Sequence, residues 1–396
     1  MSTIQLQKKS STIEPIISMV AVGDICLGLD VKSLLSEAGP EWIFGNTGRV
    51  LVDADVVFGN LECIISDDDV AHQPGTIAVP PSRASCIRKG LFTVLSLANN
   101  HIRDLSDRGL LDTIRFLDSQ GVCRIGAGID NRSARDPVII DCRGLRIGFL
   151  GYADNSTGNK QRLDPAARYC KPGIACLKER KLYIDIQKLR SQVDILVVSI
   201  HADLEFQEYP SMPRVKLSRR LIDYGADVLL EHHPHVVQGV ERYKRGIIAY
   251  SLGNFIFPVK GNEYMEANSS MCDKGFLLKI DLGRSGVIKH DIFPFEISNQ
   301  HSPELMDEVS ARSFKTYVQR LSENLANEYF IENAWYQTSR RQLMRELRGL
   351  VSMFHRHGVG SVLRRIFYLL RTSENRRWMK GVVAQFFHIS SWSKGS

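Results

Sequence analysis

The chain has 396 residues, of which 43% are hydrophobic and 24% charged, and this length allows one large α/β domain with an appendage. The formal net charge is +7. Residues 340–380 contain eleven Lys or Arg and two acids and so carry +9, which leaves a net −2 elsewhere. The basic character therefore belongs to the C-terminal part. No stretch approaches the ~20 apolar residues needed to cross a bilayer, which excludes a spanning segment.

Seven short apolar runs predict buried strands. They are residues 16–22, 56–58, 93–97, 146–150, 194–200, 227–230 and 247–251. Continuous runs of this kind are typical of parallel strands that are covered on both faces. Residues 275–282 and 287–293 predict a late antiparallel pair.

Helical patterns lie between several of these strands. The first helix is predicted to begin at an N-cap, Asp107, and to end at Gly121. Its apolar positions share one face: Leu110, Ile114 and Leu117. A second helix spans 214–224 and ends at Gly225. The alternation of strands and helices predicts an α/β sandwich over residues 16–298, after a flexible polar tail of residues 1–15.

Residues 299–396 are predicted to form a helical, basic C-terminal extension. Two sets of apolar residues fall at helical spacing, with arginines interleaved: Leu343, Leu347, Leu350 and Phe354, then Val362, Ile366 and Leu369. One hypothesis is that residues 340–380 lie on an anionic membrane surface or an acidic partner. The other is that their apolar face packs on the main domain.

The cysteines and the N-terminus indicate the compartment. The eight cysteines are scattered and include no CxxC pair, so neither a zinc ribbon nor a disulfide framework is indicated. This pattern fits a reducing cytosol. The first apolar run is too short for a signal-peptide core followed by a cleavage site. We expect a cytoplasmic protein, soluble or peripheral at the membrane, without a signal peptide.

Polar residues that can bind metals follow six of the predicted strands, just past their ends. They are Asp24; Asn60 and Glu62; Asn99, Asn100 and His101; His201; His232, His233 and His235; and Asn254. In open α/β sheets, ligands bind at the carboxyl ends of the strands. We therefore expect these side chains to converge on one site.

This mixture of side chains favours a pair of metal ions. Carboxylate and amide oxygens suit Mg²⁺ or Mn²⁺, and imidazoles suit Zn²⁺ or Fe. Two such ions clamp a phosphoryl group and activate a bound water. A nearby histidine that binds no metal can protonate the leaving group. We predict two divalent ions, drawn from Mn, Fe, Zn and Mg.

Each residue alone also has a simpler explanation. Asp24 or Asn254 could be a turn residue, Glu62 could pair with a surface arginine, and His201 could be a core histidine. The His233-Pro234-His235 sequence is more specific, because the proline fixes a bend that can aim both rings inward. The complete set favours a metal site.

Six sequence blocks together resemble one known family. They are VGDICLG (22–28), GNLEC (59–63), LANNHIRDLSDRGLLDT (97–113), HADLE (201–205), GADVLLEHHPHVVQGVE (225–241) and AYSLGNFIF (249–257). They are similar to the CapA-type, poly-gamma-glutamate capsule synthesis family, which is related to calcineurin-like metallophosphoesterases. The resemblance covers residues 17–260 and implies a calcineurin-like α/β sandwich with sheets flanked by helices.

The resemblance also implies a role for each residue. The metal ligands would be Asp24 for the first ion, Glu62 as the bridging carboxylate, Asn100 and His201 for the second ion, and His233 and His235 divided between the two. His101 would donate a proton to the leaving group. The remaining residues would contact substrate or support the ligands: Asn60, Asn99, Glu205, His232 and Asn254.

The sequence departs from the phosphoesterase pattern in three places. Cys26 stands where phosphoesterases usually have a histidine, two residues after Asp24. Glu62 stands where they have an aspartate. Glu231 precedes His232, where the capsule family tends to have glycine. Members of that family often carry an N-terminal membrane anchor, and the sequence shows none.

Two functions follow from the resemblance. The first is a metal-dependent hydrolase in the biosynthesis of capsule, poly-gamma-glutamate or a related exopolymer such as an exopolysaccharide, acting on an anionic polymer or a phosphoester. The alternative is a non-catalytic, metal-containing scaffold that binds an anionic polymer. Expected partners are membrane-bound proteins of polymer synthesis and export. Nucleic acid is not expected, because the basic segment alternates Arg with aliphatic residues and not with aromatic platforms.

Overall fold

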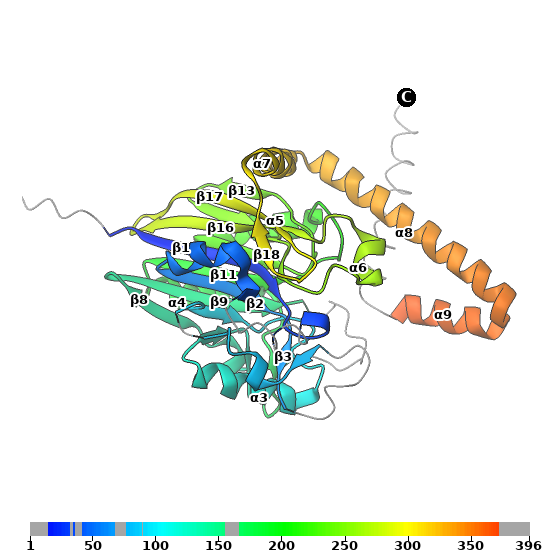
Figure 1. Cartoon of the computed structure of the whole chain (residues 1–396), viewed down its shortest axis with the longest axis horizontal. Helices are drawn as coiled ribbons and strands as arrows, with labels where there is room; N and C mark the ends of the chain where they lie inside the picture. Colours follow the sequence, from blue (N-terminus) through cyan, green and yellow to red (C-terminus); the bar gives the residue numbers. More distant parts are fainter. Residues whose placement is uncertain are drawn as a thin grey trace, which may run out of the picture.

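Two β-sheets form the centre of the protein (Figure 1). The computed structural model describes residues 15–31, 35, 42–67, 77–88, 90–154 and 166–371. The first sheet runs in the order β18 (Pro303–Leu305), β17 (Gly286–Ile297), β16 (Lys274–Gly283), β1 (Ile17–Ile25), β2 (Val56–Leu61), β5 (Val94–Ser96) and β6 (Cys123–Ile125), and β15 (Asn254–Ile256) also pairs with β1. Strands β1, β2, β5, β6 and β15 are parallel.

The second sheet has six strands. Their order is β13 (Val240–Tyr243), β14 (Gly246–Ala249), β12 (Val228–His232), β11 (Ile195–His201), β9 (Leu145–Ala153) and β8 (Val138–Cys142). The four central strands are parallel, and the two edge strands are antiparallel. Every predicted strand is present. Several strands extend further than predicted. As a result, four of the polar residues lie at the carboxyl ends of their strands and not beyond them: Asp24, Asn60, His201 and His232.

Both faces of both sheets are covered by apolar side chains. Between the sheets lies one core cluster, in which Phe58 of β2 stacks on Phe149 of β9 at 6.2 Å between ring centroids. Helix α3 (Ser106–Ser119) packs on the outer face of the first sheet. Helices α4 (Glu179–Arg190) and α5 (Met212–Tyr224) pack on the outer face of the second. This confirms the predicted α/β sandwich flanked by helices and explains the continuous apolar runs.

Short elements complete the domain. They are η1 (Trp42–Thr47), α2 (Gly48–Val52), η3 (Pro81–Arg83), η4 (Ser133–Arg135), α6 (Glu263–Asn268), the strand pair β3 (Ile64–Ile65) and β4 (Ala78–Val79), and the strand pair β7 (Ala127–Gly128) and β10 (Gly173–Ile174).

The first predicted helix begins one residue earlier than its predicted N-cap. Leu105 occupies the N-cap position without a side-chain hydrogen bond, and Asp107 lies in the first turn of α3, where it pairs with Arg103. The predicted cap at Asp107 is therefore wrong, although a carboxylate in the first turn still suits the helix dipole. Its predicted apolar face is buried. Gly121 and Gly225 follow the two helices with φ of 65° and 122°, which glycine adopts readily.

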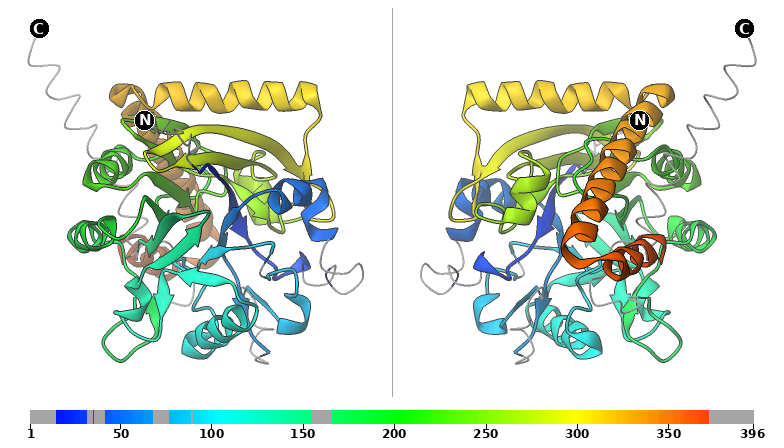
Figure 2. Two further views of the ribbon diagram at one scale, coloured as in Figure 1. Left: turned by 90° about the vertical axis from the view of Figure 1, so that its left-hand side faces the viewer. Right: turned by 90° about the vertical axis from the view of Figure 1, so that its right-hand side faces the viewer.

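The chain beyond residue 298 first completes the sandwich and then leaves it. Strand β18 extends the first sheet, and α7 (Glu308–Asn324) adds Phe314, Val318 and Leu321 to the core between the sheets. Helices α8 (Glu328–His357) and α9 (Val359–Arg371) follow as a hairpin that turns at Gly358. They lie on the side of the sandwich that carries α6 (Figures 1 and 2).

The predicted C-terminal helices are present as far as residue 371, although Pro303–Leu305 at the start of the predicted extension is a strand of the first sheet. Residues 372–380 of the predicted basic segment, and the predicted tail except for residue 15, lie outside the described residues. Within the described part of the chain, no helix is both long and apolar enough to span a membrane.

Gly23 allows β1 and the loop before β15 to approach closely. A Cβ atom at Gly23 would lie 1.9 Å from the carbonyl oxygen of Gly253, which accepts a hydrogen bond from the backbone N–H of Asp24. We expect Gly23→Ala to lower the free energy of unfolding by about 3 kcal/mol, measured by chemical denaturation. Gly349→Ala is the control, because nothing lies within 4 Å of a Cβ there. It should raise stability by up to about 1 kcal/mol. Equal effects of the two substitutions would contradict the close approach.

Candidate metal centre

The first sheet contributes two fully buried carboxylates. Asp24 at the end of β1 lies in register with Asn60 of β2 and Asn254 of β15. Glu62 follows β2 directly and is also fully buried. The Asn60 amide donates to Asp24 Oδ1 at 2.8 Å and to Glu62 Oε2 at 3.4 Å. The parallel strands therefore bring both carboxylates to one edge of the sheet.

The second sheet contributes the imidazoles. His201 ends β11 in register with His232, which ends β12. His233 and His235 follow on either side of Pro234, with φ of 102° and 57°. Such left-handed conformations are rare for residues other than glycine and concentrate at functional sites. They turn the His233 ring to 4.7 Å from the His201 ring and 6.0 Å from the His235 ring, so the predicted inward bend is present.

Glu62 Oε1 lies at the centre of the imidazoles. It is 3.8 Å from His201 Nε2, 3.9 Å from His235 Nε2 and 4.0 Å from His101 Nε2. These separations are too long for hydrogen bonds but close to twice a metal–ligand bond of about 2.0–2.2 Å. Several buried polar atoms have no hydrogen-bond partner among the described residues: Asp24 Oδ2, Glu62 Oε1, His233 Nδ1 and both ring nitrogens of His232. Unpaired buried groups of this kind are costly, and cations would satisfy them.

Three overlapping groups of side chains have the spacing needed to hold a metal ion. They are Asp24, Glu62 and His235; Glu62, His201 and His233; and Glu205, His233 and His235. Within each group the candidate ligand atoms lie within 4.8 Å of one another. The first two groups share Glu62. Glu205, expected from sequence only to support the site or contact substrate, is thus also placed as a candidate ligand, and it accepts a hydrogen bond from Tyr264.

Amide side chains fix the orientation of the rings. Asn100 Oδ1 lies 2.8 Å from His201 Nε2, so both can face one ion. Asn254 donates to the backbone oxygens of His235 and Cys272, which directs its Oδ1 towards His235 Nδ1 at 2.9 Å. His235 Nδ1 then carries the proton and leaves Nε2 able to bind a metal.

Asn99 and His232 lie behind the central groups. Asn99 donates to the backbone oxygen of Leu61 and accepts from the backbone N–H groups of His101 and Ile102, so its amide is used in shaping the loop. His232 Nδ1 lies 3.3 Å from Asp24 Oδ1. Both residues support the centre from the side of the strands.

His101 differs from the other histidines in its exposure. Its side chain is 24% exposed, whereas those of His201, His233 and His235 are buried. Its Nδ1 lies 2.8 Å from Asp104 Oδ2, which leaves Nε2 facing the centre. Asp104 was not identified from the sequence, and its spacing of three residues from His101 is the only signal that could have indicated it. A carboxylate in this position fixes the ring and its tautomer.

Burial dominates the electrostatics of the cluster. It raises the pKa of Glu62 well above its ordinary value, and the Asp24 and Glu205 carboxylates add to the effect. Burial also lowers the pKa of His201, and lowers that of His233 to about 4. For Asp24, burial acts in the opposite direction, but the neighbouring His232 and His235 outweigh it and lower the pKa. Bound cations would favour the deprotonated form of every one of these groups.

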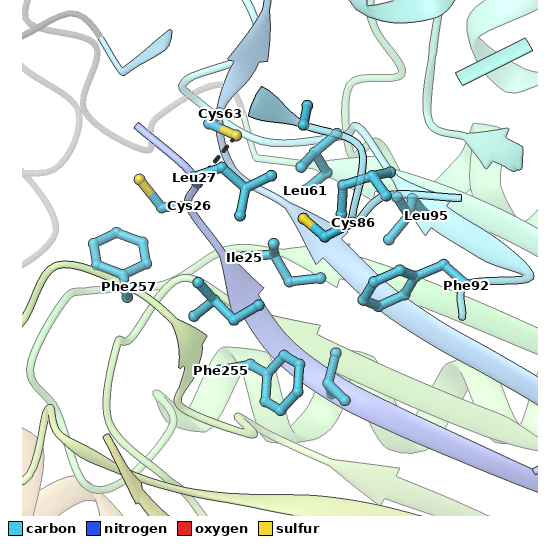
Figure 3. Packing of buried hydrophobic residues seen from close by; sticks show 14 of the residues in the cluster. Ile25, Cys26, Leu27, Leu61, Cys63, Cys86, Phe92, Leu95, Phe255 and Phe257 are labelled. Carbon is cyan, nitrogen blue, oxygen red and sulfur yellow. Dashed lines mark hydrogen bonds between the residues drawn. The ribbon is translucent and has the colours of Figure 1, made fainter. Parts of the chain in front are cut away.

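Two of the residues that depart from the family patterns, Cys26 and Glu231, contribute to packing and to contacts between elements. Cys26 lies in the apolar core with Ile25 and Phe257 (Figure 3), burial raises the pKa of its thiol, and it belongs to none of the three groups. Glu231 is buried in an ion pair with Arg214 and accepts a hydrogen bond from the Ser218 hydroxyl. It therefore ties α5 to the end of β12, next to His232.

The chain is thus a two-sheet α/β sandwich whose parallel strands end on one buried cluster of carboxylates and imidazoles. More particularly, the chain belongs to the family described as bacterial capsule synthesis protein PGA_cap, a model of which matches residues 18–259. This confirms the family resemblance seen in the sequence.

Individual relatives carry names from capsule and polymer biosynthesis. The capsule biosynthesis protein CapA of Bacillus anthracis is 31% identical over 250 residues, which are 61% of this chain and 60% of that protein. The PGA biosynthesis protein CapA of Bacillus subtilis (strain 168) is 26% identical over 315 residues, 78% of this chain and 79% of that protein. Among solved structures, the 5'-nucleotidase from Candida albicans SC5314 is similar with a TM-score of 0.41 at 10% identity, over 78% of this chain and 58% of that chain.

The lowered pKa of His233 makes folding of the metal-free protein sensitive to acid. Between an unfolded pKa of about 6.5 and the folded pKa of about 4, the unfolded chain binds a proton that the folded protein does not. Stability is therefore present above this window and is lost as the pH falls through it. As the pH falls through this window, the free energy of unfolding of chelator-treated wild-type protein should fall more steeply than that of chelator-treated His233→Asn. The two slopes should differ by up to about 1.4 kcal/mol per pH unit. Chemical denaturation at a series of pH values measures both slopes. Parallel slopes would contradict a lowered pKa of His233 in the folded protein.

Proposed function

We propose that the protein is a metal-dependent hydrolase that acts in the biosynthesis of capsule, poly-gamma-glutamate or a related exopolymer. The single observation that carries the hydrolase assignment is the position of Glu62 Oε1. This buried oxygen is surrounded by three imidazole nitrogens at 3.8–4.0 Å and has no hydrogen-bond partner among the described residues. Family membership supports the pathway.

We assign two divalent ions, drawn from Mn, Fe, Zn and Mg, to the two groups that share Glu62. Asp24 and His235 would complete one site, and Asn100, His201 and His233 the other. Such a pair activates a water molecule and neutralises charge on a phosphoryl group. The donor set fits, because it combines hard oxygen ligands with imidazoles.

The protein's own residues supply orientation and a proton. His101 is the proton donor to the leaving group, because its Nε2 faces the centre while its ring is partly open to solvent. Asp104 holds the ring in this orientation through Nδ1. The amides of Asn60 and Asn254 keep Asp24 and His235 in place. The substrate class is a phosphoester or an anionic polymer.

The second candidate is a scaffold that binds metal and holds an anionic polymer without turnover. The observation that favours it is Cys26, whose buried thiol stands where phosphoesterases usually have a histidine. The same centre would then serve as a fixed cluster of positive charge.

Metal content tests the centre itself. We expect about two divalent ions per chain after reconstitution, measured by elemental analysis of the full-length protein. His233→Ala should lower the metal content, because His233 belongs to two of the three groups. The control is His290→Ala in β17, outside all of these groups, which should bind as much metal as wild type. Stoichiometry near zero with Mn²⁺, Zn²⁺ and Fe²⁺ alike would overturn the metal assignment.

Turnover separates the two candidate functions. On a panel of phosphomonoester and phosphodiester substrates, His101→Ala should lower the rate about 10²–10⁴-fold while metal content stays at the wild-type level. Asp104→Asn should cause a smaller loss. If His101→Ala removes metal as completely as His233→Ala does, the proton-donor role is wrong. Full metal occupancy without hydrolysis of any substrate, together with retention of soluble polyglutamate, would favour the scaffold.

A further inference from the structure

The C-terminal helices form an arm, which we define as residues 344–371. Before the arm, α8 is attached to the sandwich. Ile331 is buried, the Trp335 indole donates to the backbone oxygen of Tyr209 at 3.0 Å, and Leu343 packs against Leu204. Beyond Leu343 the helix leaves this contact and turns at Gly358 into α9 (Figure 2). These contacts attach the near end of the arm to the sandwich.

Both helices of the arm expose large apolar side chains. Eight of its large apolar side chains are between 38% and 62% exposed: Met344, Leu347, Val351 and Phe354 in α8, and Val359, Leu363, Ile366 and Phe367 in α9. At about 3.6 residues per turn, each set of four spans an arc of about 80–100°. Each helix thus carries one apolar stripe. Packing on the main domain, expected as one of two possibilities, is seen at Leu343, whereas the side chains of these stripes are exposed.

Arginines border the stripes. Residues 340–371 contain eight arginines and one acid, Glu346. Arg340, Arg341 and Arg348 are exposed, and no ion pair with a carboxylate is found for them among the residues that the structure describes. They line a hollow of about 490 Å³ together with Gln337 and Met344. Arginines of the sandwich are used differently: Arg219, for example, pairs with Glu241 at 2.8 Å.

We propose that the arm docks on an anionic lipid surface. An amphipathic helix with a basic border lies in the plane of a membrane interface, with its apolar stripe among the acyl chains and its arginines at the phosphates. The positive charge of the arm favours an anionic lipid surface over the other candidate occupants. A second copy of the arm would bring a net +5 against +5, and an anion without apolar surface would leave the stripes in water. The proposal is independent of the reaction at the metal centre.

Vesicle co-sedimentation of the full-length protein tests the docking. The protein should pellet with vesicles of phosphatidylglycerol mixed with phosphatidylcholine at low salt and stay in the supernatant with phosphatidylcholine alone. The bound fraction should fall as salt rises, because surface charges are screened. Failure to pellet with the anionic vesicles, or equal binding to both kinds, would overturn the proposal.

Two sets of substitutions separate a lipid surface from other occupants. Leu347→Glu with Leu363→Glu, and Arg340→Gln with Arg341→Gln and Arg348→Gln, should each weaken binding to anionic vesicles about tenfold or more. The controls Val52→Glu and Val309→Glu change side chains that are more exposed still, on α2 and α7, and should bind as wild type does. If only the arginine set weakens binding, the arm is an anion site. If the wild-type protein forms a dimer without lipid, and the variant with Leu347→Glu and Leu363→Glu does not, the arm binds a second copy of the chain. Either result overturns the proposal.

Discussion

The burial of Asp24 and Glu62 is the constraint on which the rest of the structure depends. Two carboxylates without solvent are unstable together unless positive charge or strong donors surround them. The first sheet alone cannot supply these groups, because its strand ends carry mainly amides and one partly exposed histidine. The imidazoles come from the second sheet. The apolar core between the sheets, where Phe58 stacks on Phe149, therefore sets the distance across which oxygen and nitrogen ligands face each other.

The side chains around the centre are of two kinds: ionisable groups and neutral groups that orient them. Asp24, Glu62 and the buried histidines are the candidate ligands, and neutral amides orient them without adding charge that burial would penalise. Asn254 determines which nitrogen of His235 is free, and Asn60 restrains both carboxylates. Glu231 and Arg214 act further out, where an ion pair fastens helix α5 to the strand that carries His232. The centre is thus rigid on the side of the strands.

Much of the fold and the centre could be predicted because apolar runs mark strands that are covered on both faces, and polar residues at their carboxyl ends must meet at an edge. Periodicity could not show that these strands belong to two sheets, since a buried strand looks the same beside any neighbour. It also could not reveal the left-handed φ of His233 and His235, which depends on packing around Pro234. Asp104 and Glu205 were missed or underrated because their roles depend on how loops fold back. The predicted N-cap at Asp107 was wrong because the N-cap position of α3 is occupied by Leu105, whose side chain makes no capping hydrogen bond.

The register between β1 and β15 has a consequence for how the protein is made. Asp24 pairs with Asn254, so residues separated by about 230 positions in the chain meet at the centre. A ribosome adds roughly 5–20 residues per second, and the N-terminal carboxylates therefore exist for many seconds before their partners have been synthesised. During that interval Asp24 and Glu62 remain hydrated and belong to no enclosed site. An ion at the proposed centre would then be bound late in biogenesis, after the two sheets have joined.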